Sequence, residues 1–157
     1  MPKEIEKKFL VIDNSWENYV VGKILLKQAY IAITEDCIVR VRLSDKKAWL
    51  TVKGKQIGFT RTEFEYEIPL REGIELLKEF SPEKQIIKTR FFLECKGNEW
   101  IVDVFDGNNE GLVIAEIELR SEKSKFFMPE WLGEDVTTDF KYTNLHLVEH
   151  PFNKWEK

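Results

Sequence analysis

The sequence predicts an α+β protein, a mainly antiparallel β-sheet or barrel with peripheral helices. Three observations lead to this fold class. Many short segments alternate apolar and polar residues with a period of two, which is typical of strands with one apolar face. Tight-turn signals rich in Gly, Asn and Asp separate these segments at near-regular spacing, as in chains of hairpins. A few intervening segments place apolar residues at helical spacing instead.

The alternating segments are the expected strands, and their polar positions carry mostly charged side chains. In chain order they are residues 4–9, 28–33, 39–43, 50–53, 61–68, 88–93, 102–104 and 115–119. The expected turns between strands are Ser44–Lys47, Lys53–Gln56, Lys96–Glu99 and Asp106–Asn109. Several short strands joined by tight turns favour an antiparallel sandwich or barrel.

Three segments between the strands are predicted to be helical. Ser15 is a suitable N-cap for a helix running from Trp16 to about Leu25. A second helix is expected over residues 71–80, ending before the Ser-Pro pair that follows it. The third is expected over residues 139–149.

Size, charge and cysteine content restrict the class of protein. The chain has 157 residues, so we expect one domain over residues 1–157. The formal net charge of -4 argues against a surface for nucleic acid or for an anionic membrane. No apolar run approaches the roughly 20 residues of a membrane helix, and the charged N-terminus is unlike a signal peptide. Cys37 and Cys95 lie far apart without a CxxC motif, so we expect free thiols and a cytoplasmic location.

The charged strand faces are sorted by sign, whereas a face that only provides solubility usually mixes signs. If the apolar faces point outward against helices, the charged faces line an interior. The bases then expected inside are Lys8, Arg40, Arg42, Lys53, Arg61, Lys88 and Arg90. The acids expected inside are Glu4, Glu6, Glu63, Glu65, Glu67, Asp103, Glu116 and Glu118. Buried charges must be paired or bind ligands. Clustered carboxylates suit Mg²⁺ or Mn²⁺ and clustered guanidiniums suit phosphate, so the pattern indicates a metal–polyphosphate site.

These residues resemble the CYTH domain, the family of triphosphate tunnel metalloenzymes. Glu4–Lys8 matches the ExExK signature of that family, and further motifs follow in the same order along almost the whole chain. They are Arg40–Arg42, Thr51–Gly54, Arg61–Glu67, Lys88–Arg90, Val102–Phe105, Ala115–Leu119 and Val136–Asn144. The resemblance implies an eight-stranded antiparallel tunnel with a charged interior.

The resemblance also implies roles for individual residues. The residues that resemble metal-binding acids are Glu4, Glu6, Glu63, Glu65, Glu116 and Glu118, with Asp103 serving a second metal or orienting a base. The residues that resemble the triphosphate clamp are Lys8, Arg40, Arg42, Lys53, Lys88 and Arg90. Arg61 is in phase with the clamp but is equally suited to pairing with acids near Glu63.

Tyr30 and Lys88 match a tyrosine and a lysine that act as a catalytic pair in the short bacterial members. The alternative for Tyr30 is an aromatic plug in the barrel. For Lys88 the tunnel carboxylates are expected to raise the pKa, which opposes a role as general base.

The resemblance implies hydrolysis of a small triphosphate, with Mg²⁺ or Mn²⁺ as cofactor and in-line attack of water on the terminal phosphorus. Inorganic tripolyphosphate is the first choice of substrate, because we find no segment that would build a base- or thiazole-binding pocket. The alternatives are an adenylate cyclase that forms cyclic AMP and pyrophosphate, a thiamine or nucleoside triphosphatase, and a polyphosphate-binding module without activity. A homodimer is compatible with the sequence.

One motif points to different chemistry. Residues 146–150 read His-Leu-Val-Glu-His, the H-x-x-E-H pattern of a zinc protease family. Two histidines at i and i+4 on a helix can chelate zinc. Pro151 follows at once and no matching distal glutamate motif is present, so we expect surface histidines near a helix end.

Overall fold

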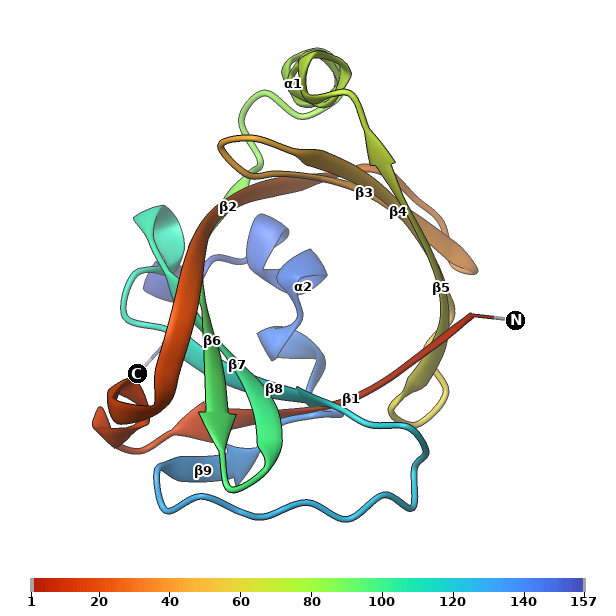
Figure 1. Ribbon diagram of the computed structural model, residues 1–157. Helices are drawn as coiled ribbons and strands as arrows, with labels where there is room; N and C mark the ends of the chain where they lie inside the picture. The colour runs from red at the N-terminus through yellow and green to blue at the C-terminus, as the bar shows by residue number, and fades with distance from the viewer. Residues whose placement is uncertain (1, 157) are drawn as a thin grey trace.

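The computed structural model describes residues 2–156 (Figure 1). These residues contain nine β-strands, two α-helices and four short 3₁₀-helices. The strands are β1 (Lys3–Val11), β2 (Val20–Ile33), β3 (Cys37–Leu43), β4 (Ala48–Gly54), β5 (Thr60–Ile68), β6 (Ile86–Cys95), β7 (Asn98–Phe105), β8 (Val113–Glu118) and β9 (Leu132–Asp135). The helices are η1 (Ser15–Tyr19), α1 (Leu70–Phe80), η2 (Gly107–Asn109), η3 (Phe140–Tyr142), α2 (Asn144–Glu149) and η4 (Phe152–Lys154).

The first eight strands close into a ring, as Figure 1 shows in a view through its middle. The hydrogen-bonded order is β5-β4-β3-β2-β6-β7-β8-β1-β9, and a further pairing between β1 and β5 completes the circle. In that pairing Lys3 lies opposite Thr62 and Ile5 opposite Thr60. The predicted eight-stranded antiparallel tunnel is therefore confirmed. The short strand β9, which the sequence did not indicate, extends the sheet beyond β1.

The predicted turns connect the predicted strands. The tightest of them joins β6 to β7 through Lys96 and Gly97, which both have positive φ values, of 50° and 80°. Two central residues with positive φ are the signature of a type I′ hairpin turn, whose twist suits antiparallel strands. Glycine adopts this conformation without strain, which explains why the Lys-Gly dipeptide marks the turn.

Much of the apolar core lies outside the ring, between the strands and the segments that cover them. One cluster joins Phe9, Trp100 and Val102 of the ring to Trp16 of η1 and Trp131 of the segment before β9. A second joins Ala29 and Val41 of the ring to Leu77 of α1. Because the strands bury their apolar faces outward, the opposite, charged faces are left to line the interior.

One end of the ring is closed by the C-terminal segment. Leu147 of α2 packs against Ile86, Phe105, Leu112 and Ile114 in a third buried cluster. Figure 1 accordingly shows α2 within the outline of the ring. Within residues 2–156, no helix is both long and apolar enough to cross a membrane.

The helix predicted from Trp16 to about Leu25 is wrong beyond its first turn. Only Ser15–Tyr19 is helical, as a 3₁₀-helix, and β2 begins at Val20. The β2 strand pairs with β6 from Val20 to Gln28, so the ladder hydrogen bonds of the ring outweigh the local helical spacing.

The other two helix predictions fare better. The helix α1 is confirmed and begins at Leu70, one residue earlier than expected. The helix expected over residues 139–149 is divided at Thr143, whose side chain accepts a hydrogen bond from the backbone N–H of His146 and so caps α2.

Candidate active site

The interior of the ring contains a cavity of about 1300 Å³ whose wall is rich in charged side chains. Every residue expected inside the tunnel or given a role in the site lies on this wall except Glu67, Lys88 and Asp103. Arg40 and Arg42 of β3 lie across the ring from Glu116 and Glu118 of β8, since β3 and β8 are opposite each other in the strand order. The tunnel thus brings together residues from positions 4 to 118 of the chain.

The register of β1 against β8 concentrates the acids. Glu6 lies directly opposite Glu118, and Lys8 lies opposite Glu116. Glu4 precedes Glu6 by two residues and therefore points to the same face of β1. Like charges placed directly across a strand pair are destabilising unless a cation lies between them.

The pKa values of these acids reflect that crowding. Burial and the nearby Glu116 raise the pKa of Glu6 to about 7. Burial, with Glu4 and Glu6 close by, also raises the pKa of Glu118. Without a bound cation the surroundings of Glu6 and Glu118 therefore shift these two carboxyl groups toward their protonated forms.

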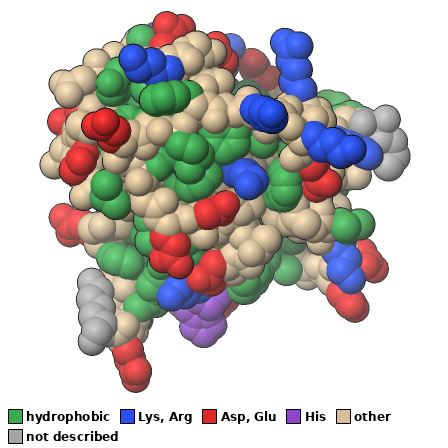
Figure 2. Space-filling model, turned by 90° about the horizontal axis from the view of Figure 1, so that it is seen from below, with side chains coloured by type: hydrophobic (Ala, Val, Ile, Leu, Met, Phe, Trp, Pro, Cys, Tyr) green, Lys and Arg blue, Asp and Glu red, His purple; other side chains and the backbone are tan. Residues whose placement is uncertain are grey.

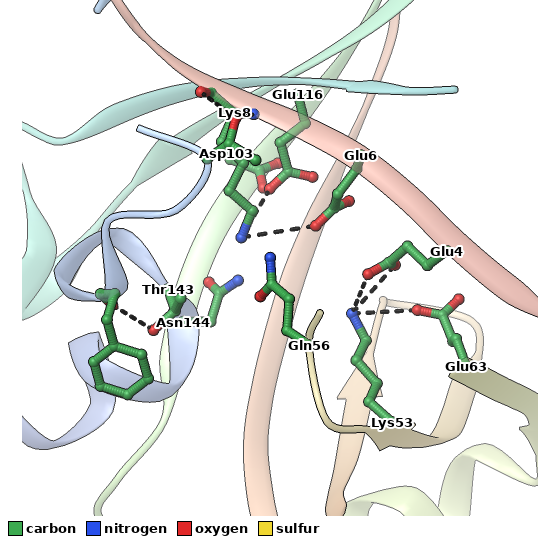
Figure 3. A network of polar contacts seen from close by, with 12 residues as sticks. Glu4, Glu6, Lys8, Lys53, Gln56, Glu63, Asp103, Glu116, Thr143 and Asn144 are labelled. Carbon is green, nitrogen blue, oxygen red and sulfur yellow. Dashed lines mark hydrogen bonds and ion pairs between the residues drawn. The ribbon is translucent and has the colours of Figure 1, made fainter. Parts of the chain in front are cut away.

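Two lysines offset part of the negative charge (Figure 3). Nζ of Lys8 lies 3.8 Å from a carboxylate oxygen of Glu6 and 3.8 Å from one of Glu116. Nζ of Lys53 lies 3.1 Å from Glu4 and 3.2 Å from Glu63. Figure 3 shows both ammonium groups pointing into the same space as these acids. Of the carboxylates in this group, Glu118 alone forms no ion pair with a lysine or arginine of residues 2–156.

The arginine side of the tunnel has three guanidinium groups with different partners. Arg40 lies 3.3 Å from Glu65 and 3.1 Å from the hydroxyl of Thr51. Arg90 donates two hydrogen bonds to Asp103, of 2.9 and 3.0 Å. Such bidentate pairs are strong and fix the plane of the guanidinium group.

Arg42 is the exception, because no carboxylate of residues 2–156 lies within ion-pair distance of it. Its Nε donates a 2.8 Å hydrogen bond to Oε1 of Gln28. Burial, reinforced by the neighbouring Arg40 and Arg90, lowers the pKa of Arg42 to about 9. A partly buried cation without an acid partner is a position where a bound anion is strongly stabilised.

Gln28 is a functional candidate that the sequence interpretation missed. It is fully buried at the point where β2 meets β6, opposite Ile86. The alternation in β2 places it on the same face as Tyr30, which was the available signal. A pattern defined by charged residues does not include a neutral amide such as Gln28.

Two charged residues of β5 differ from the rest of the predicted lining. Arg61 lines the cavity, but its guanidinium donates hydrogen bonds of 3.0 and 2.8 Å to the backbone carbonyl of Gly54 rather than pairing with an acid. Glu67, expected inside, is exposed and lies 3.4 Å from Lys47 of the turn before β4. Glu67 stands near the end of β5, where the strand has left the enclosed part of the tunnel.

Lys88 and Asp103 lie behind the cavity wall, where both side chains are almost completely buried. Nζ of Lys88 donates a 2.8 Å hydrogen bond to Asp103 and lies 3.4 Å from Oδ1 of Asn144. Tyr30, by contrast, lies on the cavity wall. Tyr30 thus faces the cavity directly, whereas Asp103 and Asn144 enclose the other residue of the predicted catalytic pair, Lys88, behind the wall.

The expected net rise in the pKa of Lys88 is wrong, because burial outweighs the effect of the carboxylates. Burial lowers this pKa to about 7; Asp103 opposes the shift, and Arg90 and Arg42 reinforce it. Asp103 is the main opposing group, and its two oxygens also accept hydrogen bonds from Arg90. Although burial alone would raise the pKa of Asp103, Arg90 and Lys88 lower it well below the usual range.

The donor set fits a hard divalent cation. The carboxylates of Glu4, Glu6 and Glu118 face one region in which the protein provides less positive than negative charge. No group of three or more His, Cys, Asp or Glu side chains in residues 2–156 is arranged to hold a metal ion by itself. Mg²⁺ commonly binds one or two carboxylates and completes its coordination with water and substrate phosphate, so such a cage is not required.

Comparison with known proteins agrees with this geometry. Residues 2–149 match the family model of the CYTH domain. An inorganic triphosphatase of Acetivibrio thermocellus is 44% identical over 157 residues, covering 100% of both chains. An inorganic triphosphatase of Nitrosomonas europaea is 32% identical over 149 residues, covering 92% of this chain and 96% of the relative.

Solved structures lead to the same family. A crystal structure of an inorganic triphosphatase superposes with a TM-score of 0.64 at 30% identity, covering 94% of this chain and 95% of the other. A putative adenylyl cyclase from Hippeastrum, described as having a dominant triphosphatase activity, superposes with a TM-score of 0.58 over 75% of this chain and 80% of its own. At 16% identity the latter likeness concerns the fold alone. The closed ring, its charged interior and the match along nearly the whole sequence establish that this chain belongs to the CYTH domain family.

Proposed function

We propose that the protein is an inorganic triphosphatase that hydrolyses tripolyphosphate with the help of Mg²⁺ or Mn²⁺. The observation that carries the proposal is the placement of Arg42. Its guanidinium faces the cavity without a carboxylate partner in residues 2–156, across the ring from a crowded group of acids. A short polyanion that brings its own divalent cation neutralises both sides at once.

In this proposal the bases of the tunnel hold the phosphate oxygens. Arg42 offers the guanidinium nitrogens that its bond to Gln28 leaves free. Arg40 and Arg90 are held in place by Glu65 and Asp103, so they reach the substrate with little loss of side-chain entropy. Lys8 and Lys53 complete the clamp where it meets the acids.

Glu4, Glu6 and Glu118 are the residues that we propose hold the metal ion, and Glu63, Glu65, Glu116 and Asp103 support them through charge and water. When bound, Mg²⁺ or Mn²⁺ supplies positive charge that polarises the phosphate oxygens of the substrate. The protein then has mainly to position the substrate and to stabilise the negative charge that develops on the leaving phosphate.

The proton of the attacking water needs an acceptor. Lys88 has a pKa near the operating range of a general base, but Asp103 and Asn144 hold its amine behind the wall. We propose that Tyr30 orients the water at the cavity surface and that Lys88 receives the proton through an intervening water. Because Cys37 and Cys95 are both free, we further propose a reducing, cytoplasmic setting.

The experiment that tests this function measures product release from four substrates: tripolyphosphate, ATP, thiamine triphosphate and pyrophosphate. Each is incubated with Mg²⁺ and with Mn²⁺, and phosphate and pyrophosphate are determined separately. We expect fastest release of phosphate from tripolyphosphate. Pyrophosphate and a cyclic nucleotide formed from ATP would identify a cyclase instead, and binding without any release would identify a polyphosphate-binding module.

A further inference from the structure

A pair of histidines lies on the outer side of the segment that closes the tunnel. His146 lies in α2 and His150, four residues later, is its C-cap; their ring centroids are 4.7 Å apart with an interplanar angle of 33°. Figure 2 shows the histidine side chains of the protein, in purple, gathered at one place on the surface. They are the only two histidines of the chain.

The imidazole nitrogens of this pair are available. Neither ring forms a hydrogen bond or an ion pair with any other part of residues 2–156. The nearest acid in the sequence, Glu149, is paired with Lys84 at 2.9 Å and forms no ion pair with either imidazole. The donor atoms are therefore free to bind a ligand from solution.

Aromatic neighbours hold the pair in its place. The His146 ring packs edge-on against Phe140 at 5.4 Å and lies 6.4 Å from the ring of Trp155. The indole N–H of Trp155 donates a 2.9 Å hydrogen bond to the backbone carbonyl of His150. The ring contacts limit the positions of the His146 ring, and the Trp155 bond holds the backbone of His150, which together lower the entropic cost of binding one ion between the two residues.

We propose that His146 and His150 form a binding site for a divalent transition-metal ion, with Zn²⁺ as the expected physiological ion. Two histidines at i and i+4 on one helical face chelate such ions, and neutral imidazole is a preferred ligand of zinc, copper and nickel. Water fills the remaining positions, because no third protein ligand lies with the pair in residues 2–156. The site differs in chemistry from the tunnel, whose oxygen donors suit Mg²⁺.

The position of the pair at the end of the helix also favours a cation. His150 is the C-cap residue of α2, and its ring lies beside that of His146. An ion shared by the two rings therefore lies at the C-terminal end of α2, where positive charge is stabilised.

A metal ion at this site would act on the end of the tunnel. Thr143, Asn144 and Leu145, immediately before His146, all line the cavity, and Asn144 contacts Lys88. An ion shared by His146 and His150 connects α2 to the turn at Pro151 and so stabilises the closing segment. Its predicted effect is to raise the thermal unfolding temperature of the protein, by ligand linkage to the folded state.

The test is a titration of the full chain, without an affinity tag, with Zn²⁺. Binding is measured by isothermal titration calorimetry at about pH 7.5, where imidazoles are largely neutral. Excess Mg²⁺ is present throughout so that the tunnel carboxylates are occupied by a hard cation. We expect saturable uptake of Zn²⁺ by the wild type. Removing a direct ligand in His146→Asn or His150→Asn is expected to weaken binding by about tenfold or more, since even losses in the surroundings of a metal site reach that size.

His150→Cys provides the matched control, because a thiolate also ligates zinc. This variant should recover Zn²⁺ binding and, with Co²⁺, show the absorption band of a cobalt–thiolate bond. The unfolding temperatures without Zn²⁺ establish that all three variants fold. Unchanged Zn²⁺ affinity in both Asn variants, or no Zn²⁺ uptake by the wild type in excess Mg²⁺, would overturn the proposal. Neither result depends on the activity of the tunnel.

Discussion

Oε1 of Gln28 accepts a 2.8 Å hydrogen bond from Nε of Arg42, and this contact fixes a tunnel arginine that has no acid partner within residues 2–156. Gln28 is completely buried and thus has little freedom to move away from Arg42. A neutral acceptor holds the guanidinium in place without cancelling its charge, whereas a glutamate would hold it and neutralise it.

The first prediction follows from this contact. Gln28→Leu removes the acceptor and leaves Arg42 free to turn. The lost hydrogen bond is worth about 0.5–1.5 kcal/mol. We expect KM for tripolyphosphate to rise while kcat changes less. Gln28→Glu should raise KM more than Gln28→Leu does, because the new carboxylate competes with phosphate for Arg42. Equal KM values for the wild type and both variants would show that Gln28 does not position Arg42.

Arg42→Ala is expected to weaken tripolyphosphate binding more than metal binding. The loss of a charge-assisted hydrogen bond is worth about 1.5–3 kcal/mol, which corresponds to a KM roughly ten to a hundred times higher. Steady-state kinetics and Mg²⁺ titration check the two effects separately. Arg71→Ala on the exposed face of α1 is the control and should leave both unchanged. A variant Arg42→Ala with wild-type KM would contradict the assignment of Arg42 to the clamp.

The raised pKa of Glu6 predicts how stability depends on pH without metal. Its pKa is about 7 in the folded chain against an ordinary value of 4.5, so the folded state binds more protons between these values. The contribution of Glu6 to the free energy of unfolding is therefore fully present below about pH 4.5 and is lost as the pH rises through about 7. Thermal unfolding in a chelator should therefore show this loss in the wild type and a smaller one in Glu6→Gln. Identical profiles would mean that the carboxyl group of Glu6 is not protonated in the folded state.

Gly73 allows α1 to approach the ring, and Gly73→Ala is expected to lower stability. A Cβ at this position would lie 2.5 Å from Cβ of Ala48 and 2.7 Å from Cδ2 of Leu43. Overpacking of this kind costs about 1–3 kcal/mol, which exceeds the roughly 1 kcal/mol that Ala gains over Gly in a helix. Urea unfolding measures the difference, with the exposed Glu75→Ala as control. A more stable Gly73→Ala protein would show that α1 shifts freely on the sheet.

The ring and most of its lining could be predicted from the sequence, because the period-two alternation and the sorting of charge by sign identify which strand face is enclosed. Glu6 and Arg42 illustrate this, since both belong to charged positions on regular strands and both line the cavity. The helix predicted after Ser15 failed because residues 20–25 satisfy their backbone by pairing with β6, a contact distant in sequence.

Depth behind the wall could not be predicted, because alternation assigns a face and not a distance from the cavity. Lys88 shares the inward face of β6 with Arg90, yet Asp103 and Asn144 enclose Lys88 and leave Arg90 on the wall. The direction of the Lys88 pKa shift depends on this enclosure. Gln28 escaped notice for a related reason, since its role depends on the position of Arg42 across the strand pair.

The central claim is that the tunnel acids and a divalent cation together hydrolyse tripolyphosphate. It is tested most directly by measuring phosphate release from tripolyphosphate, with and without Mg²⁺ or Mn²⁺, by the wild type and by Glu4→Ala and Glu118→Ala, each first verified as folded. We predict release by the wild type only when the cation is present. In each variant we predict a loss of about a hundredfold or more, which corresponds to about 2.7 kcal/mol. Wild-type rates in both variants, or equal rates with and without the cation, would contradict the account.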